Sequence, residues 1–351
     1  MLLLIFLCLS AGLRGVLAPR GSCPCPLPRF EPILIGIVSG LFSENRIPDG
    51  SVVDAGAHDG SFSCHFATLA PERTFRAVEP LRRNFVALKH TFTRCTNIIP
   101  AHHGLGNRRI RLDPGEGAAK WDAVGDGLVG YRNLINHSNE SSEAFNVEVL
   151  DQLVGSSGAW NGERLGLLHL DVEGSELDAL MGSVDTLRRD LPLLTLELHV
   201  HQDADYSHRL LSATAALGYD AFVVEEMCGI RADCRNLICI PRARLAKFTR
   251  SPTLDLVTAA RKLFYVDAAS IAMHAYPCCK PGGACCRGKR NCCSKDSVAS
   301  WLRHAQREYD NKGRAVGNRD PALYAPTLFL YQHKLRWPGP RPTDALYNVT
   351  A

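Results

Sequence analysis

The sequence lacks several features that would place it at once in a common class of proteins. Its 351 residues carry 40 Lys and Arg against 36 Asp and Glu, and a scattered net charge of +4 argues against nucleic acid as the main partner. The most apolar stretch, residues 1–12, is shorter than the roughly 20 residues that a membrane-spanning helix needs. No internal repeat occurs apart from pairs of adjacent cysteines. With 46% hydrophobic residues, the chain has enough apolar material for a full globular core.

The apolar start of the chain predicts a secretory signal peptide over residues 1–18, although no Lys or Arg precedes it. A signal anchor that spans residues 2–18 is the alternative, and beyond such an anchor we expect no membrane span. Three glycosylation sequons, at Asn136, Asn139 and Asn348, agree with secretion. We therefore expect a glycoprotein of the secretory pathway, either secreted or kept in the lumen of the endoplasmic reticulum or Golgi.

The 14 cysteines also favour an oxidising compartment, because six of them fall as adjacent pairs within residues 278–293. A small disulfide knot is the favoured interpretation, with a connectivity that the sequence does not fix. Zinc is the alternative because thiolates bind it well, but the pairs are adjacent and lack Cys-x-x-Cys spacing. The basic residues of this segment suit either an anionic glycan or a solvated face.

Composition divides the rest of the chain into three parts. Residues 19–47 are expected to form a linker and a leading helix, residues 48–245 a domain, and residues 246–351 an extension that includes the Cys-rich segment 278–293. Residues 113–143, rich in Gly, Asp, Asn and Ser, are expected to be a surface excursion, and residues 253–275 to be helical.

Within the domain, apolar strand patterns alternate with helical ones. Strands are expected at 51–54, 74–78, 97–100, 165–170, 193–200, 221–224 and 237–240, and helices at 61–70, 82–92, 175–189 and 206–217. This alternation predicts an α/β fold with a mostly parallel sheet and helices on both faces. The two successive strands at the end predict a hairpin.

The segment SVVDAGAHDGSFS, residues 51–63, joins the first strand to the first helix of the domain. Ligands of open α/β sheets bind at the carboxyl ends of the strands, where such turns lie. Gly56 and Gly60 give a Gly-x-x-x-Gly spacing, which lacks the middle glycine of a dinucleotide site. Glu79 ends the next strand, where an acid can bind both hydroxyls of a ribose. Together they indicate a ligand with a ribose but no pyrophosphate, such as S-adenosylmethionine (SAM).

Four motifs, VDAGAHDGSFS, VEPLRRNFVAL, LLHLDVEGSELDAL and LLTLELHVH, resemble in order those of the FkbM-type SAM-dependent methyltransferase family over about residues 48–240. The resemblance implies a class I SAM-dependent methyltransferase fold, Rossmann-like with a mostly parallel seven-stranded sheet. It also implies methylation of oxygen, typically on sugars and related hydroxyl compounds. Matching the motifs assigns cofactor binding to Asp54, Gly56, Gly60, Glu79, Asn84 and Asp171.

Polar residues at the ends of two neighbouring strands are the catalytic candidates. Asp171 and Glu173 alternate on one strand end, and Glu197, His199 and His201 on the next, so each set shares a face. A sugar hydroxyl needs a general base or a metal ion to become nucleophilic. We expect His199 as the base, with His201, Asp171 and Glu173 as further catalytic candidates. In the metal alternative, Asp171, Glu173 and Glu197 would bind magnesium, and an added histidine would favour zinc.

Three other histidines are less favoured candidates for the site. His169 stands where the family often has Lys, and we expect it to be packed rather than catalytic. His102 and His103 follow the third strand, where an exposed pair is favoured over contact with the adenine.

The sequence therefore predicts a SAM-dependent O-methyltransferase of the secretory pathway that acts on a carbohydrate or glycoconjugate. One alternative is a secreted binding module that keeps the fold without catalysis and uses the basic Cys-rich segment. Another is methylation of a small lipid or metabolite hydroxyl. The sequence gives no indication of the oligomeric state.

Overall fold

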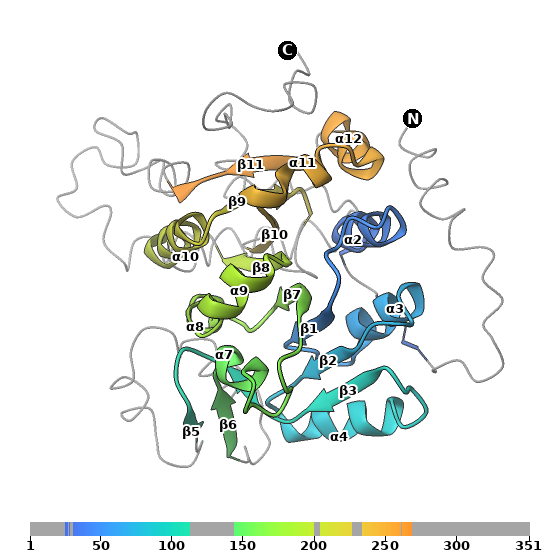
Figure 1. Cartoon of the computed structure of the whole chain (residues 1–351), viewed down its shortest axis with the longest axis vertical. Helices are drawn as coiled ribbons and strands as arrows, with labels where there is room; N and C mark the ends of the chain where they lie inside the picture. Colours follow the sequence, from blue (N-terminus) through green and yellow to red (C-terminus); the bar gives the residue numbers. More distant parts are fainter. Residues whose placement is uncertain are drawn as a thin grey trace, which may run out of the picture.

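The computed structural model describes residues 25, 26, 28, 31–112, 144–199, 204–226, 234–260 and 262–268. Figure 1 shows a central sheet with helices packed on both of its faces. The signal segment, the three sequons and the Cys-rich segment 278–293 lie outside the described residues and stay predictions.

An eight-stranded sheet in the order β11-β9-β10-β8-β7-β1-β2-β3 forms the centre of the molecule. Strands β1, β2, β3, β7 and β8 pair in parallel, whereas β10 is antiparallel to β8 and β9, and β11 is antiparallel to β9. The predicted α/β fold with a mostly parallel sheet is confirmed, and β11 adds one strand to the seven expected. The strands are β1 Ser51–Ala55, β2 Phe75–Val78, β3 Ile98–Ala101, β7 Leu165–Leu170, β8 Leu193–His199, β9 Tyr219–Val224, β10 Cys234–Pro241 and β11 Leu263–Val266.

Helices cover both faces of this sheet, so the central strands are buried throughout. Every residue of β7 and of β9 is buried, which explains their nearly continuous apolar sequences. One face packs against α2 Pro32–Ser43, α3 Ser61–Leu69, α4 Arg82–Thr91 and α12 Pro252–Ala259. The other packs against α7 Leu150–Val154, α8 Glu176–Met181, α9 Val184–Asp190 and α10 Ala204–Ala216.

The strand order reverses between β1 and β7. From β1 the chain proceeds to β2 and β3 on one side, whereas β7 leads to β8 on the other (Figure 1). The carboxyl ends of these strands meet at one edge, and such a switch point is where open α/β sheets bind ligands. This position directs attention to the residues that follow β1, β2, β7 and β8.

The segments before and after the expected domain are bound to each other. Glu44, directly after α2, accepts hydrogen bonds from the Ser251 hydroxyl and the Thr253 amide at the start of α12. Arg46 donates to the carbonyl oxygen of Lys247 at 2.9 Å. Residues outside 48–245 thus belong to the same packed body.

The helix expected at 175–189 is divided into α8 and α9. A Cβ atom on Gly182 would lie 1.9 Å from the carbonyl oxygen of Gly106, so the chain passes close to another loop at this point. The Asp151 carboxylate accepts a 2.8 Å hydrogen bond from the Thr186 amide and caps the new helix. Close packing and a cap from a distant residue therefore interrupt an otherwise helical sequence.

The helix expected at 253–275 is confirmed over 253–259 and wrong at 263–266, while residues 269–275 lie outside the described part of the chain. Helix α12 ends at Ala259, the Lys262 amide donates to the carbonyl oxygen of Val257, and the chain then forms β11. The sequence Leu263–Val266 pairs with β9 and supplies a sheet edge that sequence patterns did not indicate.

A second, three-stranded sheet in the order β4-β6-β5 flanks the excursion. Its strands are β4 Gly104–Leu105, β5 Ile110–Leu112 and β6 Phe145–Glu148. Residues 113–143 connect β5 to β6 and lie outside the described part of the chain.

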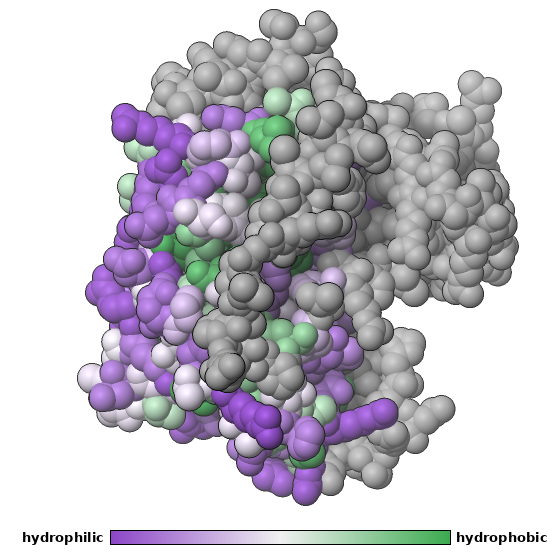
Figure 2. All heavy atoms as spheres, turned by 90° about the vertical axis from the view of Figure 1, so that its right-hand side faces the viewer, coloured by the Kyte–Doolittle hydropathy of each residue, from purple (hydrophilic) through white to green (hydrophobic). Residues whose placement is uncertain are grey.

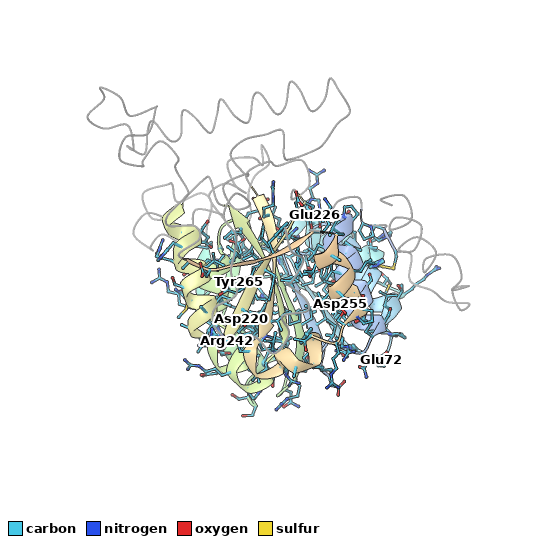
Figure 3. The ribbon with its side chains drawn as sticks, turned by 90° about the horizontal axis from the view of Figure 1, so that it is seen from above. Glu72, Asp220, Glu226, Arg242, Asp255 and Tyr265 are labelled. Atoms are coloured by element: carbon cyan, nitrogen blue, oxygen red, sulfur yellow. A yellow bond between two sulfur atoms is a disulfide. The ribbon has the colours of Figure 1, made fainter. Side chains whose placement is uncertain are left out.

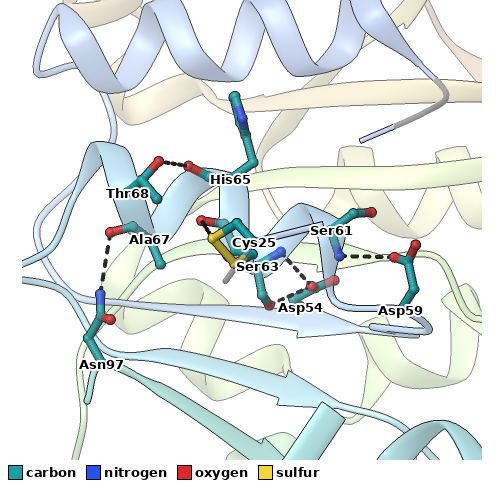
Figure 4. The surroundings of a disulfide bond; sticks show 10 residues. Cys25, Asp54, Asp59, Ser61, Ser63, His65, Ala67, Thr68 and Asn97 are labelled. Atoms are coloured by element: carbon teal, nitrogen blue, oxygen red, sulfur yellow. Dashed lines mark hydrogen bonds between the residues drawn. A yellow bond between two sulfur atoms is a disulfide. The ribbon is translucent and has the colours of Figure 1, made fainter. Parts of the chain in front are cut away.

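A disulfide joins Cys25 to Cys64 in α3, with 5.4 Å between the Cα atoms (Figure 4). The prediction of disulfide bonding is confirmed at this pair, which the sequence did not single out. In the part of the chain that the structure describes, no helix is long and apolar enough to cross a membrane.

On the face drawn in Figure 2, most of the described residues are hydrophilic, and apolar residues show in small separate areas. The large apolar side chains that are exposed are scattered over several elements: Leu69, Val86, Ile99, Met181 and Leu256. Single exposed apolar residues of this kind are normal for a globular protein.

Candidate cofactor and acceptor site

The turn between β1 and α3 is shaped for close approach of other chain segments. Gly56 and Gly60 have φ values of +88° and +78°, which favour glycine. A Cβ atom on Gly56 would lie 1.7 Å from the carbonyl oxygen of Asp171. The amides of Gly56 and Ala57 both donate to the carbonyl oxygen of Val78 at 3.0 Å. The turn thus brings the ends of β1, β2 and β7 together.

Gly60 has a different neighbour. A Cβ atom there would lie 2.3 Å from the ring of Phe92 and 2.7 Å from the side chain of Leu88. The glycine therefore allows the start of α3 to pack closely against residues at the end of α4.

Asp54, expected to bind the cofactor, fastens β1 to α3. Its Oδ2 atom accepts hydrogen bonds from the Ser63 amide at 3.1 Å and the Ser63 hydroxyl at 2.6 Å (Figure 4). The side chain is buried, and burial raises the pKa of Asp54 to about 7. The contacts of this carboxyl group give it a role in shaping the turn.

Glu79 lies buried at the end of β2, facing the same turn. Its carboxylate accepts a 2.9 Å hydrogen bond from the His58 amide and a 2.8 Å hydrogen bond from the Leu81 amide. The Asn84 side chain also hydrogen-bonds to it. Burial raises the pKa of Glu79, and these hydrogen bonds oppose the rise. Each carboxylate oxygen retains acceptor capacity, so this acid can bind ligand hydroxyl groups as well.

Acids gather on the other side of the reversal point. Asp171 follows β7 and is half-buried, and Glu197 on β8 comes next to it when the register is continued by one residue. Asn236 on β10 pairs in register with Glu197, and both side chains are buried. Burial raises the pKa of Asp171 well above its usual range, and the nearby acids, Glu197 foremost, raise it further. This row of polar groups beside the Gly56 turn is the candidate acceptor site.

The profile of the methyltransferase FkbM domain matches residues 54–221 of the chain. These residues form an FkbM methyltransferase domain. The match includes the Gly56 turn, Glu79, Asp171 and Glu197, whereas α2, α12 and β11 lie outside it.

One curated protein similar to this chain is the AMB antimetabolite synthetase AmbE of Pseudomonas aeruginosa, 29% identical over 203 residues. The alignment covers 47% of this chain and 9% of AmbE, so the chain spans less than a tenth of that relative.

Three solved structures are distantly similar to the chain. An FkbM methyltransferase from Methylobacillus flagellatus has 18% identity and a TM-score of 0.36, and the match covers 54% of this chain and 43% of that one. A precorrin-6y C5,15-methyltransferase from Geobacter metallireducens has 11% identity and a TM-score of 0.31, with 62% of this chain and 93% of that one covered. Fibrillarin from Aeropyrum pernix with bound S-adenosyl-L-methionine has 13% identity and a TM-score of 0.31, with 58% of this chain and 73% of that one covered. At such TM-scores the likeness says nothing about the role of any residue.

The described part of the FkbM domain contains no side-chain cluster that supports the metal alternative. No group of three or more His, Cys, Asp or Glu side chains is arranged there to hold a metal ion. Asp171, Glu173 and Glu197 therefore do not form such a group by themselves. A site completed by His201 or by the side chain of His199 falls outside what the structure describes.

The histidine expected as general base is placed only by its backbone. His199 is the last residue of β8 and pairs in register with Cys234. Its side chain, and the whole of His201, lie outside the described residues, so their catalytic roles stay predictions.

His169 is packed in the core, as expected. Its ring stacks on Phe62 with centroids 3.9 Å apart, and its Nδ1 lies 2.7 Å from the Thr195 hydroxyl. Burial lowers the pKa of His169 to about 4, so this ring is neutral at physiological pH.

The preferred interpretation of His102 and His103 as an exposed pair is wrong. Both are partly buried. His102 stacks on Phe85 with centroids 4.7 Å apart, and its Nε2 lies 3.1 Å from the carbonyl oxygen of Pro80. This flat surface next to Glu79 would suit an adenine, the interpretation that the sequence left second.

Two buried acids were missed as structural organisers. Glu176, the last acid of the DVEGSE motif, bonds to the backbone of its own turn and to Tyr206. Glu226 accepts hydrogen bonds from the Ile33 and Leu34 amides at the start of α2, and burial raises its pKa to about 7. The motif spacing pointed to Glu176, whereas nothing local to Glu226 indicated a partner almost two hundred residues earlier.

Proposed function

We propose that the chain is a SAM-dependent methyltransferase that transfers a methyl group to a hydroxyl of a carbohydrate or glycoconjugate in the secretory pathway. The observation that carries the proposal is the turn at Gly56, set between the buried Glu79 and the half-buried Asp171 at the reversal of strand order. The FkbM domain that contains these residues supports the same reaction class.

The residues around the turn fit SAM. A Cβ atom on Gly56 would clash with the Asp171 carbonyl oxygen, so glycine at this position lets the turn after β1 pack directly against the start of the turn after β7. Glu79 would hold the ribose hydroxyls, and the ring of His102 would lie beside the adenine. SAM supplies an activated methyl group, so the protein mainly has to orient the acceptor and accept its proton.

Two groups are candidates for accepting that proton. His199 remains our first choice, because imidazole is basic near neutral pH. The raised pKa of Asp171 makes this carboxylate a better base than an ordinary aspartate, so it is the second candidate. The row formed by the half-buried Asp171 and the buried Glu197 and Asn236 offers hydrogen-bonding groups to a polyhydroxylated acceptor.

The secretory setting is supported by the apolar start of the chain, the sequons and the disulfide Cys25–Cys64. A binding module without catalysis remains the alternative from another class. Methylation of a small metabolite hydroxyl is a further alternative, which the similarity to an antimetabolite synthetase supports.

Calorimetric titration with SAM, followed by methyl transfer from labelled SAM to a panel of glycans, lipids and small metabolites, tests the proposal. We expect SAM binding and label on a glycan. Folded protein that does not bind SAM would rule out the enzyme and favour the binding module. Label on lipids or metabolites alone would refute the carbohydrate substrate.

A further inference from the structure

We propose that Glu176 and Tyr206 are positioning residues that hold the turn at 171–174 in the shape needed for methyl transfer. The proposal rests on the methyltransferase function, and its two residues come from different elements, α8 and α10.

The turn at 171–174 has a conformation that needs support. Glu173 and Gly174 have φ values of +53° and +99°, and a non-glycine residue such as Glu173 rarely adopts the left-handed region. The same turn begins with Asp171, whose carbonyl oxygen lies against Gly56. A change in the turn would therefore move the acceptor site and the cofactor turn together.

Glu176 supports the turn through hydrogen bonds to its backbone. This side chain is fully buried. Its Oε1 atom accepts hydrogen bonds from the Val172 amide at 3.1 Å and the Gly174 amide at 3.0 Å. Hydrogen bonds to a charged acceptor are stronger than neutral ones, so the carboxylate fixes the backbone on both sides of Glu173.

Tyr206 fixes the carboxylate in turn. Its hydroxyl donates to Glu176 Oε2 at 3.0 Å and accepts from the Leu177 amide at 2.9 Å. Burial and then the charge of Glu176 raise the pKa of Tyr206, so the hydroxyl keeps its proton and remains a donor.

Tyr206 also ties the turn to the neighbouring strand end. It lies in the first turn of α10, the helix that follows β8, and β8 ends at His199. The Glu176–Tyr206 pair thus links the two chain segments that carry the proposed catalytic groups. Because both side chains are buried and bonded to backbone amides or to each other, they act through the turn.

The test compares Tyr206→Phe with Tyr219→Phe in the full chain. Tyr219, the first residue of β9, is another buried tyrosine, and its hydroxyl donates to the carbonyl oxygen of Leu187 at 3.4 Å. We expect Tyr206→Phe to lower kcat about 10- to 100-fold while the SAM dissociation constant stays within about threefold, because small misplacements of reacting groups have effects of this size. Hydrogen exchange at the Val172 and Gly174 amides should become faster. Tyr219→Phe should change neither.

A rescue series makes the test independent of one variant. Glu176→Ala should show the same loss of kcat and faster exchange, and Glu176→Gln, which keeps one oxygen for the two amides, should restore part of both. If Tyr206→Phe fails to fold, this series decides the question. Equal kcat in Tyr206→Phe and Tyr219→Phe, or unchanged exchange at 172 and 174, would overturn the proposal.

The outcome separates this inference from the proposed function. A wild-type protein that methylates nothing in the acceptor panel contradicts the function, yet the exchange measurements still decide whether Glu176 and Tyr206 hold the turn.

Discussion

At the scale of single residues, Glu79 provides the most direct test of cofactor binding. Glu79→Ala should weaken SAM binding by about 1.5–3 kcal/mol, the usual cost of losing hydrogen bonds to a charged group. Calorimetry measures the dissociation constant, with Glu72→Ala as the control because that side chain is 70% exposed (Figure 3). An unchanged dissociation constant in Glu79→Ala would place the ribose elsewhere.

Gly56 offers a comparison in which backbone strain and steric clash can be separated. Gly56→Ala combines a φ of +88° with a Cβ atom 1.7 Å from the Asp171 carbonyl oxygen. Gly218 has the same φ of +88° but nothing within 4 Å of such a Cβ atom. Gly218→Ala should cost only the roughly 1–2 kcal/mol of left-handed backbone strain. Gly56→Ala should lose more stability, measured by urea unfolding, and should also lose SAM binding; equal effects of the two substitutions would contradict the close approach.

The raised pKa of Asp54 predicts that the stability of the protein depends on pH. Its pKa is about 7 in the folded protein against 3.8 for the unperturbed group, so the folded state binds more protons between these values. The free energy of unfolding should therefore fall as pH rises from about 4 through 7. Asp54→Asn keeps an acceptor for Ser63 and never ionises, so its stability should fall less over this range.

Unfolding curves from pH 5 to 8 measure this difference. Glu226 titrates in the same direction and should account for a remaining slope in Asp54→Asn. Asp59→Asn, an exposed neighbour in the turn, is the matched control. Identical pH profiles for the wild type and Asp54→Asn would show that Asp54 is ionised throughout.

Sequence patterns indicated where the residues of this site lie, and the structure adds contacts that those patterns do not contain. Gly56 and Glu79 could be recognised because a motif carries their backbone geometry and position. The cofactor role of Asp54 stays a prediction, and its hydrogen bonds to Ser63 arise because its position on β1 directs the side chain toward α3. Glu226 had no local signal, since its partners depend on how distant segments pack.

At the scale of elements, Glu44 is predicted to hold α12 in place. It bonds to the first turn of that helix through Ser251 and Thr253, so it acts as a cap from outside the helix. Glu44→Ala should lower the free energy of unfolding by about 1–2 kcal/mol, as for other caps. Asp255→Ala changes an exposed side chain in the first turn of the same helix (Figure 3) and should have a smaller effect. A Glu44→Ala variant as stable as Asp255→Ala would refute the cap.

Elements whose periodicity is strong were predicted correctly, and those determined by tertiary contacts were not. The β7 strand is apolar in nearly every position and α4 begins just after the Glu-Pro pair, so both were found. The break between α8 and α9 depends on Gly106 and Asp151, which no local pattern includes. Strand β11 is short and lies at the edge of the sheet, and its four residues are too few for a strand pattern to stand out from the helical pattern expected over 253–275.

At the scale of the whole molecule, the packed body is larger than the FkbM match. The core cluster under α2 includes residues from β2, β9, β10, α12 and β11, so both flanks contribute to one core. A shortened chain of residues 48–245 should therefore lack a cooperative thermal transition, whereas the full chain should show one. Near-ultraviolet circular dichroism during heating measures this, and a cooperative transition in the shortened chain would contradict the prediction.

The contact between α2 and α12 also determines when the protein can fold. Glu44 and Thr253 are 209 residues apart, and a ribosome adding about 5–20 residues per second needs about 10–40 s to make that interval. Throughout this time the apolar face of α2, with Leu34, Ile37, Val38 and Leu41, has no partner from the end of the chain. The apolar face of α2 therefore lacks its α12 contacts until almost the last described strand has left the ribosome, and it favours aggregation during that time. The rate of synthesis and the supply of chaperones should therefore govern the yield of folded protein.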